Sequence, residues 1–302
     1  MRLVSFTTDT AGLSWGLLRG DDILDVRALA TLSGRESPQD VFALLSTSTL
    51  GWVSDLVRSA STSDIAQSTV SGSSVRLVAP IRPGKIVAVG RNYLDHLGEA
   101  SIKPPLWPKL FPKFPSTVIG HGDDIVKPTM TEQLDFEVEV GVVIGSTATK
   151  VQEADAMSYV AGYTILNDVS ARDIQFTDEQ ITLGKNFDTF TPMGPAITTC
   201  EDLPDPAAIA LRLRLNGEVM QESNTRHLIF SIPYLVSFIS YAMTLEPGDI
   251  ISTGTPAGVG VFRKPPLWLA PGDRIESEVD GIGTLINTVV AGSGHAPGHH
   301  TD

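Results

Sequence analysis

The chain has little of three things that would define its class at once: cysteine, basic charge and long apolar runs. A single cysteine, Cys200, among 302 residues excludes an internal disulfide framework and a cluster of thiolate metal ligands, and it fits a reducing compartment. Lys and Arg number 22 against 35 Asp and Glu, a net charge of −13, which argues against nucleic acid or an anionic membrane as a partner. An anionic substrate would have to be bound by local groups.

Apolar sequence is nowhere continuous over the roughly 20 residues that a membrane span requires, and the first residues lack the apolar stretch of a signal peptide. We therefore expect a cytoplasmic protein with no membrane partner. Apolar residues still make up 42% of the chain, which is enough for a substantial core.

The sequence pattern changes near residue 78. Residues 1–78 alternate short apolar strands with helix-like stretches, which predicts a small N-terminal α/β domain. Residues 79–291 are dominated by β-type runs, separated by Gly, Pro and the pair Asn216-Gly217, as in a sheet-rich sandwich or barrel. Residues 292–302 hold three His among Gly and Pro with no core-forming pattern, which predicts a disordered tail.

Residues 101–115 contain five prolines and three aromatic residues. This composition excludes a regular helix or a central strand. The segment is a long loop by this interpretation, and a lid, a partner-docking surface and a rigid connection all remain open.

Two carboxylates, Glu137 and Glu139, stand in an otherwise apolar, β-branched run at residues 134–145. The run is typical of a strand, on which side chains two residues apart point to the same face, with about 7 Å between their Cα atoms. A hard divalent cation such as Mg²⁺ or Mn²⁺ would neutralise such a pair. The alternative is an edge strand with a solvated polar face.

Further polar residues follow the next strand-like run. Asp168 would add a third carboxylate, although Asn167-Asp168 is also a common turn or helix cap. If the chain is helical from there, Arg172 and Gln175 share a face with Asp168. Lys185 by itself is an ordinary surface lysine.

Two other segments could carry chemistry. His96 and Glu99 are three residues apart and would touch on one helical turn. The carboxylate of Glu99 would then raise the basicity of the His96 imidazole, which could activate water. The alternative is a pair of surface residues without a catalytic role. In the Gly-rich segment 247–260, backbone N–H groups near Gly254 and the hydroxyl of Thr255 suit a carboxylate, and a tight structural turn is the alternative. The segment does not match the Gly-x-x-x-x-Gly-Lys pattern of nucleotide-binding loops.

In this order the segments resemble the fumarylacetoacetate hydrolase family, over about residues 80–290. The matching stretches are Gly-Arg-Asn-Tyr-Leu-Asp-His (90–96), Asp-Phe-Glu-Val-Glu (135–139), the run from Tyr159 to Gln175, Asn-Gly-Glu (216–218), Pro-Gly-Asp-Ile-Ile-Ser-Thr-Gly-Thr-Pro-Ala-Gly-Val-Gly (247–260), Pro-Gly-Asp (271–273) and Gly-Ile-Gly-Thr-Leu (281–285).

The resemblance implies an α+β, predominantly β fold: a mixed β-sandwich roll preceded by a small α/β domain, in a homodimer. It implies one Mg²⁺ or Mn²⁺ per chain, held by Glu137, Glu139 and Asp168. The smaller acylpyruvate hydrolase and 2-hydroxyhepta-2,4-diene-1,7-dioate isomerase branch matches best. The larger fumarylacetoacetate hydrolases supply an extra carboxylate ligand where this chain has Arg91-Asn92. That departure disfavours fumarylacetoacetate itself as the substrate.

The resemblance also implies roles for the other residues. The catalytic residues would be His96 with Glu99, Lys185 and Gln175, and the substrate-binding residues would be Tyr93, Lys113, Arg172, Gly254 and Thr255. The expected reaction is hydrolysis of a C–C bond in a 2,4-dioxo acid, of the acylpyruvate or fumarylpyruvate type, by activated water. Decarboxylation or isomerisation of an oxaloacetate-like 2-oxo diacid is the alternative, followed by a catalytically silent metal-binding protein.

Overall fold

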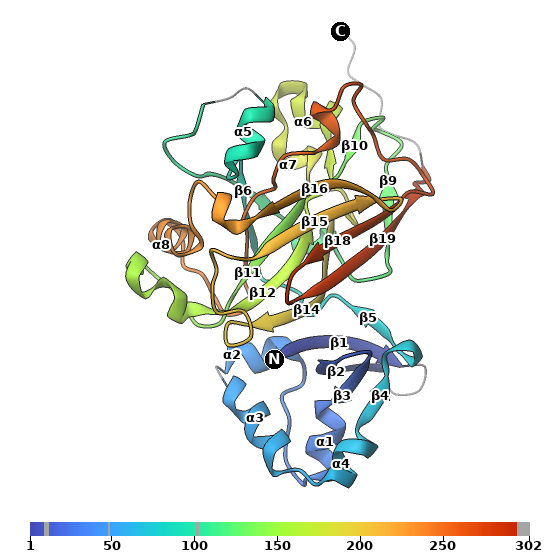
Figure 1. Cartoon of the computed structure of the whole chain (residues 1–302), viewed down its shortest axis with the longest axis vertical. Coiled ribbons are helices and arrows are strands. Elements are labelled where there is room, and N and C mark those ends of the chain that lie inside the picture. The colour runs from blue at the N-terminus through green and yellow to red at the C-terminus, as the bar shows by residue number, and fades with distance from the viewer. Residues whose placement is uncertain (9–11, 48, 101–102, 295–302) are drawn as a thin grey trace.

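The computed structural model describes residues 1–8, 12–47, 49–100 and 103–294 (Figure 1). The side chains of Leu97, Glu99, Ala100 and Asp178 are not described. Most of the predicted tail, residues 295–302, therefore lies outside the described residues.

The larger sheet has twelve strands in the described part of the chain. Along the sheet they are β4 (Thr69–Ser71), β3 (Asp22–Asp25), β2 (Gly12–Arg19), β1 (Arg2–Thr8), β14 (Thr191–Thr199), β12 (Val160–Asn167), β11 (Val138–Ile144), β17 (Ile250–Ser252), β6 (Ile86–Gly90) and β7 (Lys109–Lys113), while β5 (Arg76–Val78) pairs with β1 and β8 (Val118–Ile119) with β14. Antiparallel pairing of β1 with β14 carries backbone hydrogen bonds across the boundary predicted near residue 78.

A second sheet packs over the middle of the first. Its strands, in order, are β16 (Glu218–Asn224), β15 (Ala210–Leu215), β18 (Arg274–Val279), β19 (Gly283–Ala291) and β9 (Asp124–Lys127). Asn216 (φ 53°) and Gly217 (φ 86°) form the turn between β15 and β16 in the left-handed conformation that an Asn-Gly hairpin favours. A short pair, β10 (Leu134–Asp135) with β13 (Ser170–Ala171), lies beside the site described below.

Alternation along β11 divides the core between the two faces of the large sheet. Val138, Val140 and Val142 are fully buried in the cluster that also holds Leu213 of the second sheet. Val143 points the other way, into a cluster with the N-terminal helices. The run at residues 134–145, predicted as one strand, is divided into β10 (Leu134–Asp135) and β11 (Val138–Ile144). Strand β11 is buried on both faces, and the predicted mixed β roll is confirmed.

Helices cover the sheets in three groups (Figure 1). In the N-terminal part they are α1 (Val26–Leu32), α2 (Val41–Ser46), α3 (Leu50–Ser59) and α4 (Thr62–Gln67). Helices α5 (Leu94–Ala100), α6 (Arg172–Phe176) and α7 (Ile181–Gly184) gather at the end of the molecule away from the N-terminal part, while α8 (Ile232–Ala242) lies at one side. The 3-10 helices are η1 (Gly72–Ser74), η2 (Pro115–Thr117), η3 (Glu153–Tyr159), η4 (Thr177–Glu179), η5 (Thr225–His227) and η6 (Gly260–Phe262). No helix of the described ranges is both long and apolar enough to cross a membrane.

The described part of the Pro-rich segment, residues 103–115, is irregular at residues 103–108. Residues 109–113 form β7, which pairs with β6 and ends the large sheet. An edge strand leaves one side unpaired and so tolerates Pro112, which has no N–H to donate. The exclusion of a central strand therefore holds, although the segment contributes more regular structure than a loop.

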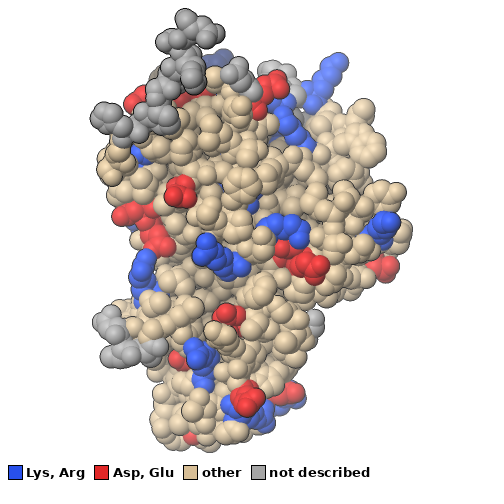
Figure 2. All heavy atoms as spheres, turned by 180° about the vertical axis from the view of Figure 1, so that it is seen from behind, with Lys and Arg blue, Asp and Glu red and all other residues tan. Residues whose placement is uncertain are grey.

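Acidic and basic side chains are interspersed on the face of the molecule that Figure 2 shows. Neither sign forms a broad continuous patch on that face.

Candidate active site

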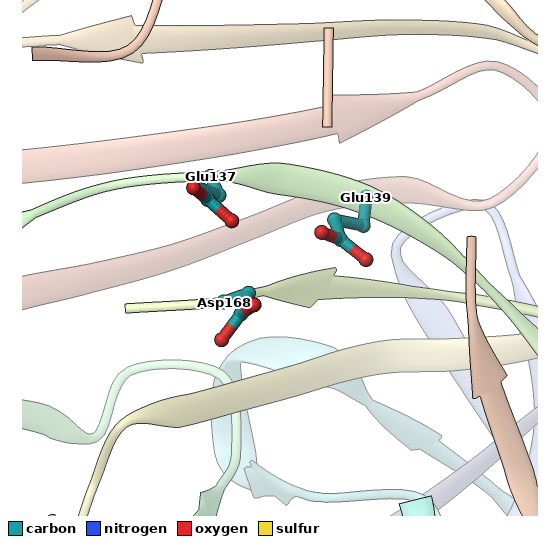
Figure 3. A group of neighbouring side chains, drawn as sticks. All are labelled: Glu137, Glu139 and Asp168. Carbon is teal, nitrogen blue, oxygen red and sulfur yellow. The ribbon is translucent and has the colours of Figure 1, made fainter. Parts of the chain in front are cut away.

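Three carboxylates converge at the end of strands β11 and β12 (Figure 3). Glu137 directly precedes β11, Glu139 is its second residue and Asp168 directly follows β12, which is the antiparallel neighbour of β11. One oxygen from each lies within 4.8 Å of the others, and all three residues are buried. The structure therefore brings together the three carboxylates that the sequence suggested as metal ligands.

Two cations neutralise part of this cluster. The Nζ atom of Lys185 lies 2.7 Å from Oε2 of Glu137 and 2.7 Å from Oδ2 of Asp168. Arg172 donates to Oε1 of Glu137 at 2.6 Å. Burial alone would raise the pKa of Glu137, but Lys185 and Arg172 hold it well below its usual range. Glu137 is therefore a carboxylate anion at neutral pH.

Glu139 has a different environment. Its Oε2 accepts hydrogen bonds from Oγ of Ser252 at 2.5 Å and from the backbone N–H of Gly254 at 2.9 Å. Burial, with the negative charges of Asp168 and Glu137, raises the pKa of Glu139 to about 8. Ionisation of Glu139 at neutral pH would place a third negative charge in this buried cluster, which is unfavourable in free energy. A bound cation would offset that unfavourable charge.

The donor set fits a hard divalent cation. Four buried carboxylates, those of Glu137, Glu139, Asp168 and Asp135, face the three buried cations Lys113, Arg172 and Lys185. Carboxylate oxygens are the ligands that Mg²⁺ and Mn²⁺ prefer, and no thiolate stands nearby to favour a softer metal. Glu137, Glu139 and Asp168 would hold the ion.

Asp135 is a supporting residue to which the sequence analysis gave no role. It is fully buried and accepts from Nε of Arg172 at 2.8 Å and from the backbone N–H groups of Gly260 (2.7 Å) and Val261 (3.1 Å). Asp135 and Glu137 thus hold the guanidinium from two sides. Its position two residues before Glu137, on the same face of an extended chain, was the available signal.

The expected helical face of Asp168, Arg172 and Gln175 does not form. Asp168 lies between strands β12 and β13, and helix α6 begins only at Arg172. Instead, Nη1 of Arg172 donates to Oε1 of Gln175 at 3.0 Å within the first turn of α6. The backbone after Asp168 is extended because Ser170 and Ala171 pair with β10.

Lys113, which the resemblance suggested as a substrate-binding residue, is only 1% exposed. Its Nζ lies 2.6 Å from Oδ1 of Asp168 and donates to the carbonyl oxygens of Lys185 (2.5 Å) and Phe190 (2.9 Å). Burial lowers the pKa of Lys113, while Asp168 acts against that shift. In this position Lys113 orients Asp168 and the chain that carries Lys185.

The Gly254-Thr255 segment is tied to β11. The hydroxyl of Thr255 donates to the carbonyl of Val138 at 3.0 Å and accepts from Nε2 of Gln221 at 2.8 Å. Oε1 of Gln221 accepts from the N–H of Val138 at 3.0 Å, so this one amide joins the two segments. Gln221 had no sequence signal, because nothing in β16 marks one polar residue as buried.

A cavity of about 290 Å³ opens onto the carboxylates. Seven of the predicted site residues line it: His96, Glu137, Glu139, Arg172, Gln175, Lys185 and Thr255. Of the three expected metal ligands, Glu137 and Glu139 are in the wall, and Asp168 is not among the lining residues. Tyr93, Lys113 and Gly254 are not among its lining residues. Apolar parts of the wall come from Phe111 and Phe262, whose ring centroid lies 5.6 Å from that of His96.

His96 and Tyr93 lie on either side of the start of α5. His96 is 7% exposed, and its interaction with Glu137 helps to lower the pKa of that carboxyl, so the two side chains are neighbours. Tyr93 is fully buried, and burial followed by the charge of Glu139 raises the pKa of its hydroxyl. The side chain of Glu99 lies outside the described residues, so its pairing with His96 stays a prediction.

Fold and site together define a class: a mixed β-roll enzyme with a buried carboxylate cluster suited to a divalent metal. Residues 85–290 match the family model described as fumarylacetoacetate (FAA) hydrolase C-terminal, and the chain belongs to that family. The family resemblance found in the sequence motifs is thereby confirmed.

Among curated relatives, the chain is 47% identical to "Oxaloacetate tautomerase FAHD2A, mitochondrial" of Bos taurus over 221 residues, covering 72% of this chain and 70% of the relative. Its human counterpart is 45% identical over 221 residues, with the same coverage.

Solved structures agree with the fold over nearly the whole chain. The fumarylacetoacetate hydrolase of Exiguobacterium antarcticum superposes with a TM-score of 0.82 at 34% identity, covering 96% of this chain and 99% of that one. The 2-hydroxyhepta-2,4-diene-1,7-dioate isomerase of Mycobacterium marinum gives a TM-score of 0.75 at 33% identity, covering 96% and 98%. The second structure agrees with the smaller branch of the family.

Proposed function

We propose that this protein is a divalent-metal-dependent tautomerase that interconverts the enol and keto forms of an oxaloacetate-like 2-oxo diacid. The observation that carries the proposal is the buried cluster of Glu137, Glu139 and Asp168 at the base of a cavity that His96 also lines. The names of the curated relatives support tautomerisation over the hydrolysis expected from the sequence.

The residues around the cavity suit proton transfer next to a carbonyl. A bound divalent cation would act as a Lewis acid toward the 2-oxo group and so make C3 more acidic. In the keto-to-enol direction, a ring nitrogen of His96 takes the proton from C3, and the electron pair of that bond forms the C2–C3 double bond. The π electrons of the C2–O double bond move to the 2-oxygen, which takes up a proton from water, and His96 returns its proton to water, so that atoms and charges of the two tautomers balance.

Lys185 is placed to stabilise the oxygen on which charge develops. Two of the three N–H groups of its Nζ donate to Glu137 and Asp168, which leaves one for a substrate oxygen. Burial lowers the pKa of Lys185, but Asp168 and Glu137 outweigh that and raise it, so the group stays a cation. A permanent ammonium suits charge stabilisation better than proton removal.

Hydrolysis of a 2,4-dioxo acid is the second candidate. It is favoured by one observation, the position of His96 in the wall beside Glu137, where an imidazole could also remove a proton from water. Decarboxylation of an oxaloacetate-like acid needs the same cation and the same 2-oxo diacid. The substrate, and not the metal, separates these reactions.

The test is a direct comparison of the reactions on one purified sample. Enol-oxaloacetate is followed by loss of its ultraviolet absorbance, with Mg²⁺ or Mn²⁺ and then with excess chelator, against the same metal without protein. Pyruvate release from oxaloacetate and cleavage of acylpyruvates are measured in parallel.

We expect metal-dependent ketonisation well above the metal-only background, and its loss in Glu137→Gln and in His96→Gln. Ketonisation no faster than the metal-only background would contradict the proposal. Faster turnover of an acylpyruvate than of oxaloacetate would favour the second candidate instead.

A further inference from the structure

Two cationic side chains, Arg91 and Lys109, line the same cavity as the carboxylate cluster but are exposed to solvent. In the described ranges, neither side chain forms a hydrogen bond or an ion pair with another residue. They differ in this from Arg172 and Lys185, which line the cavity and are each bound to buried carboxylates. The positive charge of the cavity wall that no hydrogen-bonded carboxylate neutralises is therefore on Arg91 and Lys109.

Strand pairing places the backbones of the two residues next to each other. Gly90, the last residue of β6, pairs with Lys109, the first residue of β7, and Arg91 follows directly. Consecutive residues of a strand point to opposite faces, but β6 ends at Gly90 and Arg91 leaves the strand with a φ of 58°. Both Arg91 and Lys109 line the one cavity. The absence of a side chain at Gly90 leaves the space above the pair open to a ligand.

The backbone holds Arg91 in an unusual conformation. Its φ of 58° lies in the left-handed region, which costs a non-glycine residue about 1 kcal/mol or more. Asn92 fixes this turn, because its side-chain amide donates to the carbonyls of Thr253 (2.8 Å) and Phe230 (3.1 Å) and its Oδ1 accepts from the N–H of Phe230 (2.8 Å). Arg91 is thus presented to the cavity by an anchored turn and not by a loose loop.

One carboxylate opposes the pair. Glu179 is exposed and lines the same cavity, so the exposed charged residues of the wall carry two positive charges and one negative charge. The net charge of this part of the wall is positive on a protein whose overall charge is −13. Such a local excess suits an anionic group of a ligand whose other end reaches the carboxylate cluster.

We propose that Arg91 and Lys109 form a subsite for the distal carboxylate of a dicarboxylic 2-oxo acid, so that they set a preference for diacids over 2-oxo monoacids. This inference rests on the proposed function for the class of substrate. Arg91 provides two parallel N–H donors that match a carboxylate, and Lys109 adds a point charge.

The test measures binding, and so does not depend on turnover. Oxaloacetate and pyruvate differ by the distal carboxylate, and their dissociation constants are determined by calorimetry in the presence of Mg²⁺ at low temperature. The variants are Arg91→Asn, which removes the charge but tolerates the left-handed backbone, Arg91→Lys, which keeps the charge, and Lys109→Gln. Arg19→Asn, at an exposed strand end in the N-terminal part, is the matched control.

We expect wild type to bind oxaloacetate at least tenfold more tightly than pyruvate. Arg91→Asn and Lys109→Gln should each weaken oxaloacetate binding by about tenfold. In both variants the dissociation constant of pyruvate should change less than twofold. Arg91→Lys should keep part of the preference for oxaloacetate over pyruvate, and Glu179→Gln should increase that preference above the wild-type value. Equal weakening for both acids, or no change for either, would overturn the subsite.

The two proposals fail in different ways. If oxaloacetate binds with the expected dependence on Arg91 and Lys109 but enol-oxaloacetate is not ketonised, the proposed function is wrong and the subsite stands. If ketonisation is confirmed and the variants keep the wild-type ratio of the two dissociation constants, the function stands and the subsite is wrong.

Discussion

Replacement of Glu139 by Gln separates metal binding from the integrity of the fold. In the protein, Oε2 of Glu139 accepts from Ser252 and from the N–H of Gly254. The amide oxygen of Gln can accept both hydrogen bonds, and the amide N–H₂ can face the remaining carboxylates of Glu137 and Asp168. The change therefore removes a buried negative charge and one metal ligand while it keeps the hydrogen bonds.

The expected effect on stability has opposite signs with and without metal. A ligand at 100 times its dissociation constant stabilises the folded state by about 2.7 kcal/mol, which for a chain of this size is a rise in Tm of several degrees. We expect wild type to show this rise with Mg²⁺ or Mn²⁺, and Glu139→Gln to lose most of it. Without metal, the variant should be at least as stable as wild type, because the repulsion from Glu137 and Asp168 is gone.

The pH dependence of the metal-free protein provides a second readout. Burial, Asp168 and Glu137 raise the pKa of Glu139 from 4.5 to about 8, so the folded state keeps a proton that the unfolded chain has lost. From this group, metal-free wild type loses stability as the pH rises from about 4.5 to about 8. Glu139→Gln should lack this contribution, and denaturation at several pH values measures the difference.

The matched control is Glu218→Gln, an exposed carboxylate on the β15–β16 hairpin, which should change neither readout. Two results would refute the reasoning. One is a metal-induced rise in Tm of Glu139→Gln as large as that of wild type. The other is a metal-free Glu139→Gln that is less stable than wild type by more than about 2 kcal/mol, which would mean that the ionised carboxylate holds the fold.

Three other substitutions test the support of the cluster. Asp135→Asn leaves the buried guanidinium of Arg172 with one carboxylate. In denaturant titrations it should lower the free energy of unfolding by about 3 kcal/mol, and a loss below about 1 kcal/mol would contradict the buried pair. Lys113→Met releases Asp168 and should weaken metal binding by about tenfold in calorimetry, whereas an unchanged affinity would remove Lys113 from the site. Gly254→Ala places a Cβ atom 3.0 Å from the backbone oxygen of Val89, at a φ of 98° that side chains rarely adopt. We therefore expect a lower metal affinity and a lower Tm, and an unchanged Tm would contradict this expectation.

The sequence motifs predicted the family, the mixed β fold and the three carboxylates, because each depends on local pattern. Apolar alternation along residues 134–145 determines a strand, and its period of two puts Glu137 and Glu139 on one face. The Asn216-Gly217 turn likewise follows from the left-handed conformations that these two residues tolerate.

Only the tertiary structure decided which groups surround those carboxylates. Asp135 and Lys113 became supports, and Arg172 reached Glu137 from a helix that begins after Asp168 and not with it. These contacts join segments that are far apart in the chain, so the local sequence pattern cannot specify them. The pairing of β10 with β13 and the position of β7 determine which buried charges meet. The sequence by itself determined the carboxylates, and packing determined how their charge is neutralised and which cations, Arg91 and Lys109, stay open to a ligand.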